Sequence, residues 1–446
     1  MSRNVEDGHR KHFEDLPDEI IIKIFNYLDI DDLISVSDIN SHWKELSQDS
    51  SIWKDVIYKP KVHAATTERV QLIQKMPALK AYSAMYTENI SVIIDTICKY
   101  CKEFEYLHLS GGHDLTYHLL EILFQTFPDI QKLNIPILKR DDSVQCAHLL
   151  GQLNNLSYLK FSDRYAVVSL DVLKPIADGC PSLLHMNLGD STFNESHIQY
   201  FLQKKQKQLL SFEAWCPVSP TTFYYITECS NLEAFYFNTY GYSSNLSHND
   251  MILLRKLSKL KKLKLGYFEA QLSKAVPSLF IGQGLSNVVQ LHLESLDLNE
   301  RDLTEIILNC PQLTSLTIGS INLEDALQKI GNCRKLKSLS LSGCNVTNKS
   351  IDHIVKGCPM LHELDLSCSL ETKDDVMLSV IKLTELRTLA ISYSGFSGQH
   401  FDSFPKHLHH LHEIIAYECA IEDSVWDGLL KEIPHLKIIG REWEDH

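Results

Sequence analysis

One pattern of apolar residues recurs along most of this 446-residue chain. From Phe104 onward, each copy has an apolar residue, two variable residues, a second apolar residue, one variable residue and a third apolar residue. The middle apolar residues of fourteen copies are Leu107, Leu133, Leu159, Met186, Phe212, Phe235, Leu263, Leu291, Leu316, Leu339, Leu364, Leu389, Ile414 and Ile439. Their average spacing is about 25.5 residues. A chain with this periodicity is expected to stack copies of one unit, because each unit contacts only its neighbours.

The period and the pattern are those of a leucine-rich repeat. Between the copies lie amphipathic segments such as 351–361, in which Ile351, Ile354 and Val355 form a helical stripe. Each unit is therefore predicted to be a strand, a loop and a helix. Neighbouring strands are about 4.8 Å apart, whereas packed helices need about 10 Å, so the stack should curve. We predict an α/β fold, a horseshoe with a parallel sheet inside and helices outside.

The segment 13–58 has a different character. Apolar residues follow Pro17 at helical spacing, and Asp29 to Asp32 offer caps for a second short helix. A third apolar series contains Ile39, Trp43, Leu46, Ile52 and Trp53. Three helices in so short a segment cannot bury all of these side chains among themselves, because very small domains are marginally stable. Some of them are predicted to face another protein.

This segment resembles an F-box in its Leu16-Pro17 pair, its Asp-rich break and its two tryptophans, Trp43 and Trp53. It departs at Ile39-Asn40, where many members have Val-Cys. The resemblance implies binding to a Skp-type adaptor and, through it, to the cullin and RING subunits of a ubiquitin ligase. The adaptor contacts that it implies are Leu16, Pro17, Ile20, Ile24, Leu28 and Leu33, whereas the tryptophans are expected to pack the box. The alternative is a plain helical cap on the repeats.

Eight of the twelve cysteines occupy repeat positions, and two of these, Cys344 and Cys419, lie three residues after a strand's last apolar position. Six lie three residues before a strand's first apolar position, namely Cys101, Cys180, Cys229, Cys310, Cys333 and Cys358. A small apolar thiol suits the buried end of a helix. Three of the six, Cys180, Cys310 and Cys358, stand in Cys-Pro-x-Leu units, which resemble the cysteine-containing repeat class found in many F-box proteins.

The predicted organisation has four parts. They are a flexible N-terminus (1–12), an F-box (13–58), a helical connector (59–88) and a solenoid of about fourteen units with a C-terminal cap (89–446). Because Pro, Gly and Ser are sparse in the connector, it is expected to be packed.

Composition and motifs argue against several functions. A formal charge of −14 disfavours nucleic-acid binding. There is no signal-peptide core and no apolar run long enough for a membrane, so a cytoplasmic and/or nuclear protein is expected. Cys98-x-x-Cys101 lacks a second pair, and the histidines of 407–412 occupy variable repeat positions, so neither metal nor cofactor is predicted. No catalytic motif appears, and a catalytic-cysteine ligase is the enzyme alternative.

The concave sheet face is the predicted substrate-binding surface. The seven candidates are Tyr158, Lys160, Trp215, Tyr236, Lys262, Lys264 and His292, because aromatic and cationic side chains dominate binding hot spots. The hypothesis is that they hold an acidic or phosphorylated segment, and the alternative is an ordinary solvated sheet. The sequence thus predicts a non-catalytic substrate receptor of a Skp-cullin-F-box ligase. Its rivals are an adaptor-binding scaffold without ubiquitin transfer and a leucine-rich-repeat inhibitor with an incidental cap.

Overall fold

A computed structural model describes residues 13, 16–61, 64–85, 88–110, 115–136, 142–162, 164–168, 171–215, 218–239, 245–282, 284–319, 324–344 and 346–441. The chain divides into unit 1, Met1–Leu183, and unit 2, Leu184–His446. Each unit is described by itself. The predicted flexible N-terminus and residues 442–446 of the predicted cap lie outside the described residues.

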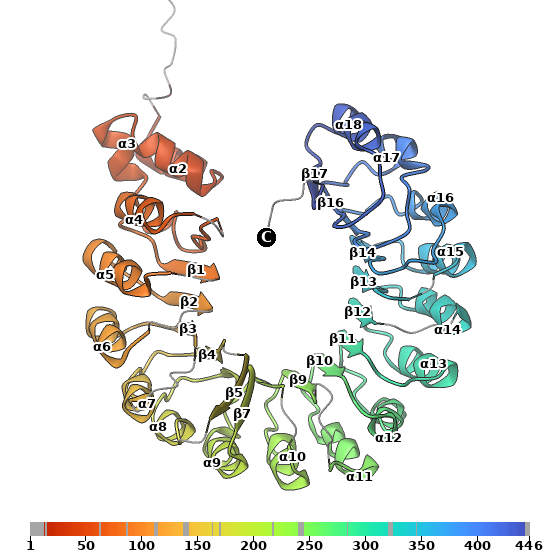
Figure 1. Cartoon of the computed structure of the whole chain (residues 1–446), viewed down its shortest axis with the longest axis horizontal. Coiled ribbons are helices and arrows are strands. Elements are labelled where there is room, and N and C mark those ends of the chain that lie inside the picture. Colours follow the sequence, from red (N-terminus) through yellow and green to blue (C-terminus); the bar gives the residue numbers. More distant parts are fainter. Residues whose placement is uncertain are drawn as a thin grey trace, which may run out of the picture. The chain divides into compact units, whose positions relative to one another are not determined.

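Unit 1 starts with three short helices and continues with alternating helices and strands (Figure 1). Its elements are α1 (Asp18–Phe25), α2 (Ile30–Ser37), α3 (Ser41–Leu46), α4 (Thr66–Lys75), β1 (Ala81–Met85), α5 (Ile90–Tyr100), β2 (Tyr106–Ser110), α6 (Tyr117–Thr126), β3 (Lys132–Ile135), α7 (Ser143–Gly151), β4 (Tyr158–Phe161), β5 (Arg164–Val168) and α8 (Leu173–Asp178). Strands β1 to β4 are parallel and pair in chain order.

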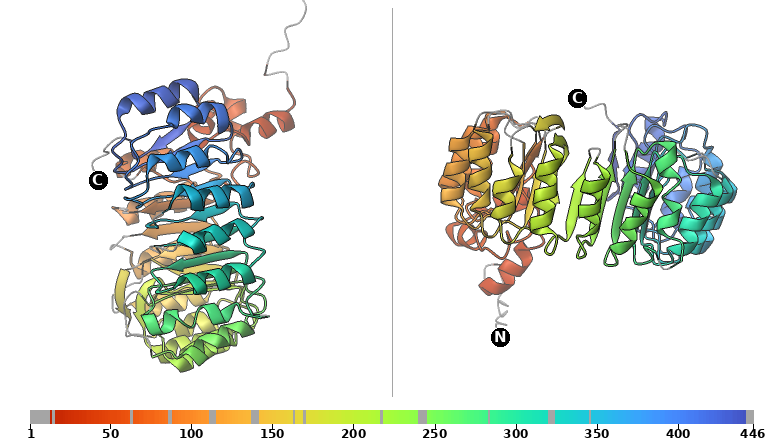
Figure 2. Two further views of the ribbon diagram at one scale, coloured as in Figure 1. Left: turned by 90° about the vertical axis from the view of Figure 1, so that its right-hand side faces the viewer. Right: turned by 90° about the horizontal axis from the view of Figure 1, so that it is seen from below.

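Unit 2 continues the same alternation, and its helices lie side by side along one face of the strands (Figure 2). Its strands are β6 (His185–Asn187), β7 (Asp190–Phe193), β8 (Ser211–Ala214), β9 (Ala234–Asn238), β10 (Lys262–Gly266), β11 (Gln290–Glu294), β12 (Ser315–Ile318), β13 (Ser338–Ser340), β14 (Glu363–Asp365), β15 (Thr388–Ala390), β16 (Glu413–Ile415) and β17 (Lys437–Ile439). Its α-helices are α9 (Glu195–Lys205), α10 (Pro220–Thr227), α11 (His248–Ile252), α12 (Ala270–Ser273), α13 (Glu300–Asn309), α14 (Glu324–Lys329), α15 (Asn348–Gly357), α16 (Met377–Val380), α17 (Phe404–His407) and α18 (Asp423–Glu432). Short 3-10 helices replace or extend some of them.

The predicted repeat register is confirmed through most of the chain. In unit 2, Leu263, Leu291 and Leu316 are buried and lie opposite one another on β10, β11 and β12. Within each unit the strands of the long parallel sheet, which leaves out β5 and β7, line the inner side and the helices the outer side, as an α/β repeat requires (Figure 1). One position was predicted wrongly, because Ile414 pairs with Ile438 and not with Ile439. The last strand is shifted by one residue relative to the spacing of the preceding units.

The repeats begin one unit earlier than the sequence pattern suggested. The predicted helical connector, 59–88, holds the expected helix α4 but also strand β1, which pairs with β2. Leu79, Tyr82 and Ala84 are buried and occupy the three apolar positions of the repeat pattern. A tyrosine and an alanine at positions usually held by leucine hid this unit from the periodicity.

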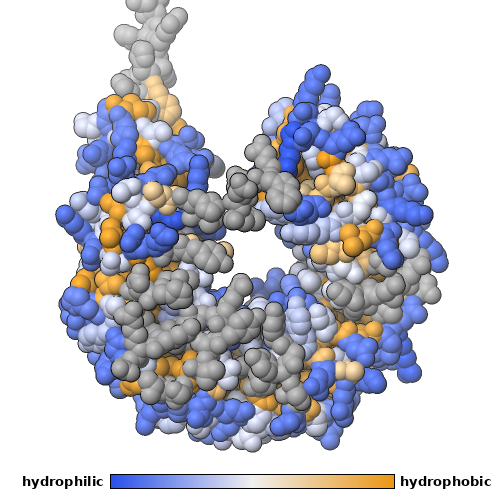
Figure 3. All heavy atoms as spheres, in the orientation of Figure 1, coloured by the Kyte–Doolittle hydropathy of each residue, from blue (hydrophilic) through white to orange (hydrophobic). Residues whose placement is uncertain are grey.

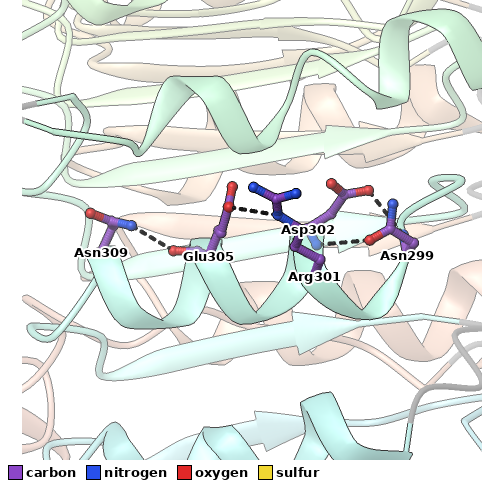
Figure 4. Close-up of polar contacts among 5 residues, drawn as sticks. All are labelled: Asn299, Arg301, Asp302, Glu305 and Asn309. Carbon is purple, nitrogen blue, oxygen red and sulfur yellow. Dashed lines mark hydrogen bonds and ion pairs between the residues drawn. The ribbon is translucent and has the colours of Figure 1, made fainter.

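The outer helices keep their polar side chains toward solvent and their ends capped. Over α13 to α16 the outer rim of unit 2 is mainly hydrophilic (Figure 3). Helix α13 begins with a capping box (Figure 4). The Asn299 side chain accepts a hydrogen bond from the Asp302 backbone N–H, and the Asp302 side chain accepts one from the Asn299 backbone N–H, both at 3.0 Å. The Arg301 to Glu305 pair one turn later lies on the solvent side of the same helix.

The burial predicted for cysteines at repeat positions is confirmed at seven of the eight positions, whereas Cys419 is half-buried. Cys101, Cys180, Cys229, Cys310, Cys333, Cys344 and Cys358 are buried free thiols. Cys180 Sγ lies 3.1 Å from the Leu150 carbonyl oxygen, and Cys358 Sγ lies 3.4 Å from that of Ile330. Because a thiol can act as a weak donor, each of these contacts gives a carbonyl oxygen of the preceding repeat a hydrogen-bond partner.

The three-helix segment is joined to the repeats by backbone pairing in unit 1. Tyr58 N–H donates to the Ala81 carbonyl (3.0 Å), and Ser83 N–H donates to the Tyr58 carbonyl (2.9 Å). The Tyr58 and Tyr82 rings meet edge to face, with centroids 5.7 Å apart. Arg69, only 4% exposed, donates from Nε to the Ala64 carbonyl at 2.9 Å. The chain after the F-box is therefore packed against the edge of the sheet.

Replacing Arg69 with alanine should lower the midpoint of thermal unfolding. The substitution leaves the carbonyl of the half-buried Ala64 without this donor, and loss of a hydrogen bond from a charged group costs about 2 kcal/mol. Arg255→Ala is the matched control, because Arg255 also donates to a carbonyl, that of Ile281 at 3.1 Å, but at an exposed site. Equal midpoints for the two variants, measured by circular dichroism, would show that Arg69 does not hold this junction.

Candidate protein-binding surfaces

The core of the F-box segment is built from one side of each helix. Ile21 and Phe25 of α1, Leu33 of α2 and Leu46 of α3 are buried. The side chain of Trp53 is buried as well, and its Nε1 donates to the Ser47 carbonyl at 2.7 Å. The Trp43 ring packs edge-on against Phe25 (5.8 Å) and Phe13 (5.1 Å). The prediction that both tryptophans pack the box is confirmed.

A stripe of apolar side chains remains on the surface of α1 and of the residues that flank it. Leu16, Ile20, Ile24 and Leu28 follow one another at four-residue intervals and are partly or largely exposed, with Ile20 at 39%. Residues four apart lie on one face of a helix. Pro17 at the start of the helix is exposed too. Five of the six residues predicted to contact the adaptor thus lie on the surface of the F-box segment.

The structure argues against the sixth predicted adaptor contact and shows two further exposed apolar residues. Leu33 is 1% exposed and belongs to the core, so its side chain is not available for a surface contact. Tyr27 and Ile39, which were not among the predicted contacts, are 90% and 58% exposed. Ile39 had been placed in the third apolar series without a predicted contact. It lies between α2 and α3, outside any helix, so helical spacing did not apply to it.

The predicted substrate residues of unit 2 form a connected cluster on the sheet. Lys264 on β10 lies beside Tyr236 on β9 and His292 on β11. Lys264 Nζ is 5.2 Å from the centroid of the Trp215 ring and 3.3 Å from Glu294 Oε2. The charge of Lys264 is therefore balanced by a carboxylate within the face. Lys262, two residues before Lys264 on β10, is exposed and makes no ion pair among the described residues.

A second carboxylate organises the other end of this cluster. Glu213 on β8 accepts from Trp215 Nε1 and from Asn187 Nδ2, the latter at 2.6 Å. Burial, with a contribution from Glu213, raises the pKa of Tyr236. Burial and then the Lys264 ammonium lower the pKa of His292, whose Nε2 lies 3.1 Å from Thr317 Oγ1. The cluster presents an aromatic and polar surface with little excess positive charge.

The two candidates of unit 1 lie on β4. Tyr158 and Lys160 are half-buried and face the same side as Lys132 and Asn134 of β3, their partners in register. The candidates therefore fall on two surfaces, one in each unit. Glu213 and Glu294 were not among the predicted site residues, because nothing in the local sequence shows which lysine a carboxylate will reach.

Metal binding and membrane insertion have no supporting geometry in the described part of the chain. No group of three or more His, Cys, Asp or Glu side chains there could hold a metal ion. Leu408 and Leu411 are buried as repeat residues, and the histidines between and beside them are exposed. No described helix is both long and apolar enough to cross a membrane.

Known proteins resemble the chain in two ways. A family profile for F-box-like domains matches residues 13–59. Over 50 residues, 11% of this chain and 7% of the relative, the chain is 40% identical to the ubiquitin ligase complex F-box protein UFO1 of Saccharomyces cerevisiae. Over 44 residues, 10% of this chain and 14% of the relative, it is 43% identical to F-box/LRR-repeat protein 12 of Bos taurus. The chain thus spans only a small share of either relative.

The second resemblance concerns the fold. The crystal structure of Rad7 and Elc1 in yeast contains a chain that aligns with 95% of this chain and 93% of its own length, with a TM-score of 0.54 and 16% identity. At this identity the likeness shows the fold alone. Residues 13–59 thus match an F-box-like domain, and parallel strand-and-helix repeats of the leucine-rich type follow them.

Alkylation should distinguish structural from reactive cysteines. Burial raises the pKa of the Cys310 and Cys358 thiols to about 12, so their thiolate fraction at pH 8 is about 10⁻⁴. Cys368 is exposed. Iodoacetamide at pH 8 should label Cys368 in the native protein well before Cys310 or Cys358, as followed by peptide mass spectrometry. Labelling of either buried thiol at the rate of Cys368 would contradict their structural role.

Proposed function

We propose that this protein is the substrate-recognition subunit of a Skp-cullin-F-box ubiquitin ligase. The observation that carries the proposal is the exposed apolar stripe of α1 in a domain that matches the F-box-like profile. Fully burying an exposed isoleucine contributes about 1.5 to 3 kcal/mol, so a partner that covered the 39% of Ile20 that is exposed would gain roughly 1 kcal/mol there, and less at the half-buried Ile24. The Skp-type adaptor is that partner, and it connects the chain to the cullin and RING subunits.

In this proposal the inner sheet face binds a protein substrate for ubiquitination and proteasomal degradation. Support comes from the tyrosines, tryptophan and lysines that rigid strands hold on that face, since such side chains dominate binding hot spots. The predicted residues Tyr158, Lys160, Trp215, Tyr236, Lys262, Lys264 and His292 remain candidates for this contact. The chain acts in the cytoplasm or the nucleus.

The protein contributes no catalytic group of its own in this account. Ubiquitin transfer is performed by the recruited enzymes, and this chain holds the target near them. The raised pKa values of Cys310 and Cys358 argue against either buried thiol as the nucleophile of a catalytic-cysteine ligase, which needs an accessible thiolate.

A second candidate function is an adaptor-binding scaffold that does not promote ubiquitin transfer. It shares the F-box surface, so adaptor binding does not separate the two. Copurification of cullin together with the adaptor is expected for the receptor. Recovery of the adaptor without cullin would favour the scaffold.

Charge introduced on the α1 stripe should abolish adaptor capture. The double variant Ile20→Asp, Ile24→Asp is expected to bind a purified Skp-type adaptor at least about 30-fold more weakly, equivalent to about 2 kcal/mol. Leu308→Asp, at an exposed apolar site on α13, is the matched control and should bind normally. Affinities come from biolayer interferometry, with unfolding midpoints as the check on folding. Undiminished capture by the double variant would overturn the adaptor proposal and leave an incidental helical cap.

A further inference from the structure

The Lys264 side chain contacts an aromatic ring and a carboxylate on the inner face of unit 2. Its Nζ lies 5.2 Å from the centroid of the Trp215 ring and 3.3 Å from Glu294 Oε2. Tyr236 lies beside Lys264 in register on β9, and Glu213 lies beside Tyr236 on β8. We refer to Glu213, Trp215, Tyr236, Lys264 and Glu294 as the Lys264 cluster. Its members come from separate repeats, so strand register brings them together.

The surroundings of the Lys264 ammonium have the chemistry of a binding site for an organic cation. An ammonium placed over an indole ring within about 6 Å of its centroid is attracted by the negative face of the ring. The Trp215 ring is oriented by a hydrogen bond of its own, because its Nε1 donates to Glu213. Glu294 is oriented as well, since the Tyr267 hydroxyl donates to its Oε1 at 3.1 Å. Both groups that hold the ammonium are therefore held in place by neighbouring side chains.

The inner face around the Lys264 cluster carries more negative than positive charge. His292, beside Lys264 on β11, adds no positive charge at neutral pH, because burial and the Lys264 ammonium lower its pKa. The inner-facing side chains of β8 to β14 include two lysines and four carboxylates, namely Lys262, Lys264, Glu213, Glu294, Glu363 and Asp365. A face with this excess attracts cations and repels anions.

The Lys264 ammonium is held loosely enough for another cation to replace it. Its distance to Glu294 is 3.3 Å, whereas Lys256 Nζ lies 2.7 Å from Glu228 Oε1 in the same unit. Charge-assisted hydrogen bonds between nitrogen and oxygen are typically about 2.8 Å long. Both Lys264 and Glu294 are partly exposed, and an ion pair in contact with solvent contributes little to stability. Lys264 thus occupies a position that a ligand ammonium can take.

We propose that the Lys264 cluster binds a lysine side chain from a basic segment of the protein substrate, which displaces the Lys264 ammonium from Trp215 and Glu294. The inference rests on the proposed receptor function and assigns the chemistry of its substrate. The incoming ammonium makes the same cation–π contact and the same ion pair, and the Lys264 side chain turns to solvent. Glu363 and Asp365 on β14 can pair with further basic residues of the segment. An acidic segment, as hypothesised from the sequence, is repelled by this face.

Three fluorescent pools of degenerate peptides, identical except for a fixed central lysine, norleucine or glutamate, test this proposal by anisotropy with the full chain. The lysine pool should bind at least about fivefold more tightly than the other two, because only lysine makes both the cation–π contact and the ion pair. The Trp215→Leu variant should lose this preference. Tyr224→Leu is the matched control and should retain it, because Tyr224 is an exposed ring of unit 2 that also lies under a lysine, Lys256 at 5.0 Å.

Replacing Lys264 tests the displacement directly, because a neutral side chain no longer competes for the cluster. The Lys264→Gln variant should bind the lysine pool at least about threefold more tightly than the native chain does. Lys262→Gln removes the same charge from the same strand, but Lys262 makes no ion pair among the described residues. This control should change the affinity by less than about twofold, since charges at exposed sites are screened by salt.

Three results would overturn the proposal: a lysine pool that binds no more tightly than either other pool, an unchanged preference in the Trp215→Leu variant, or a gain in the Lys264→Gln variant no larger than that in Lys262→Gln. Unfolding midpoints of all variants exclude misfolding. The same preparations are assayed for adaptor capture. Capture without lysine preference rejects the cluster as a binding site but not the receptor, whereas preference without capture rejects the receptor alone.

Discussion

The pairing of Tyr58 with β1 is the contact on which the rest of unit 1 depends. Through two backbone hydrogen bonds, at 3.0 and 2.9 Å, the end of the F-box segment is added to the edge of the repeat sheet. An unpaired sheet edge is a liability, and this pairing covers part of it. It also fixes the apolar stripe of α1 relative to the first strands. A receptor gains from such a connection, because a stiff link raises the effective concentration of a bound target near the recruited enzyme.

Two surfaces of different chemistry support the functional account. The α1 stripe is apolar and exposed, as a stable protein contact requires, and residues beneath it such as Ile21 and Phe25 hold the helix in place. The inner sheet faces are polar and are set by strand register. In unit 2 the carboxylates Glu213 and Glu294 engage the aromatic and cationic residues, whereas Lys132 and Lys160 of unit 1 make no ion pair among the described residues. The charges of the inner sheet face are therefore balanced differently in the two units.

Periodicity predicted most of the fold, because burial in a repeat is dictated by position. Leu263, Leu291 and Cys358 are buried where the pattern places them. The repeat unit that contains β1 was not predicted, because Tyr82 occupies a position where leucine is usual. Surface assignments were less predictable. Leu33 and Ile39 look alike in sequence, yet only the helix geometry decides which is buried. The partner of Lys264 is 30 residues away at Glu294, and register, not local sequence, brings them together.

Hydrogen exchange at the junction tests the central claim, that the F-box and the first repeats of unit 1 form one packed structure. In the native chain, the Tyr58 and Ser83 amides donate to backbone carbonyls, as do those of β2 and β3. They should therefore exchange with protection comparable to that of the Leu107 and Leu133 amides, because they open in the same cooperative unit. Rapid exchange at Tyr58 and Ser83, alongside slow exchange at Leu107 and Leu133, would contradict the account and show that the F-box is loosely tethered.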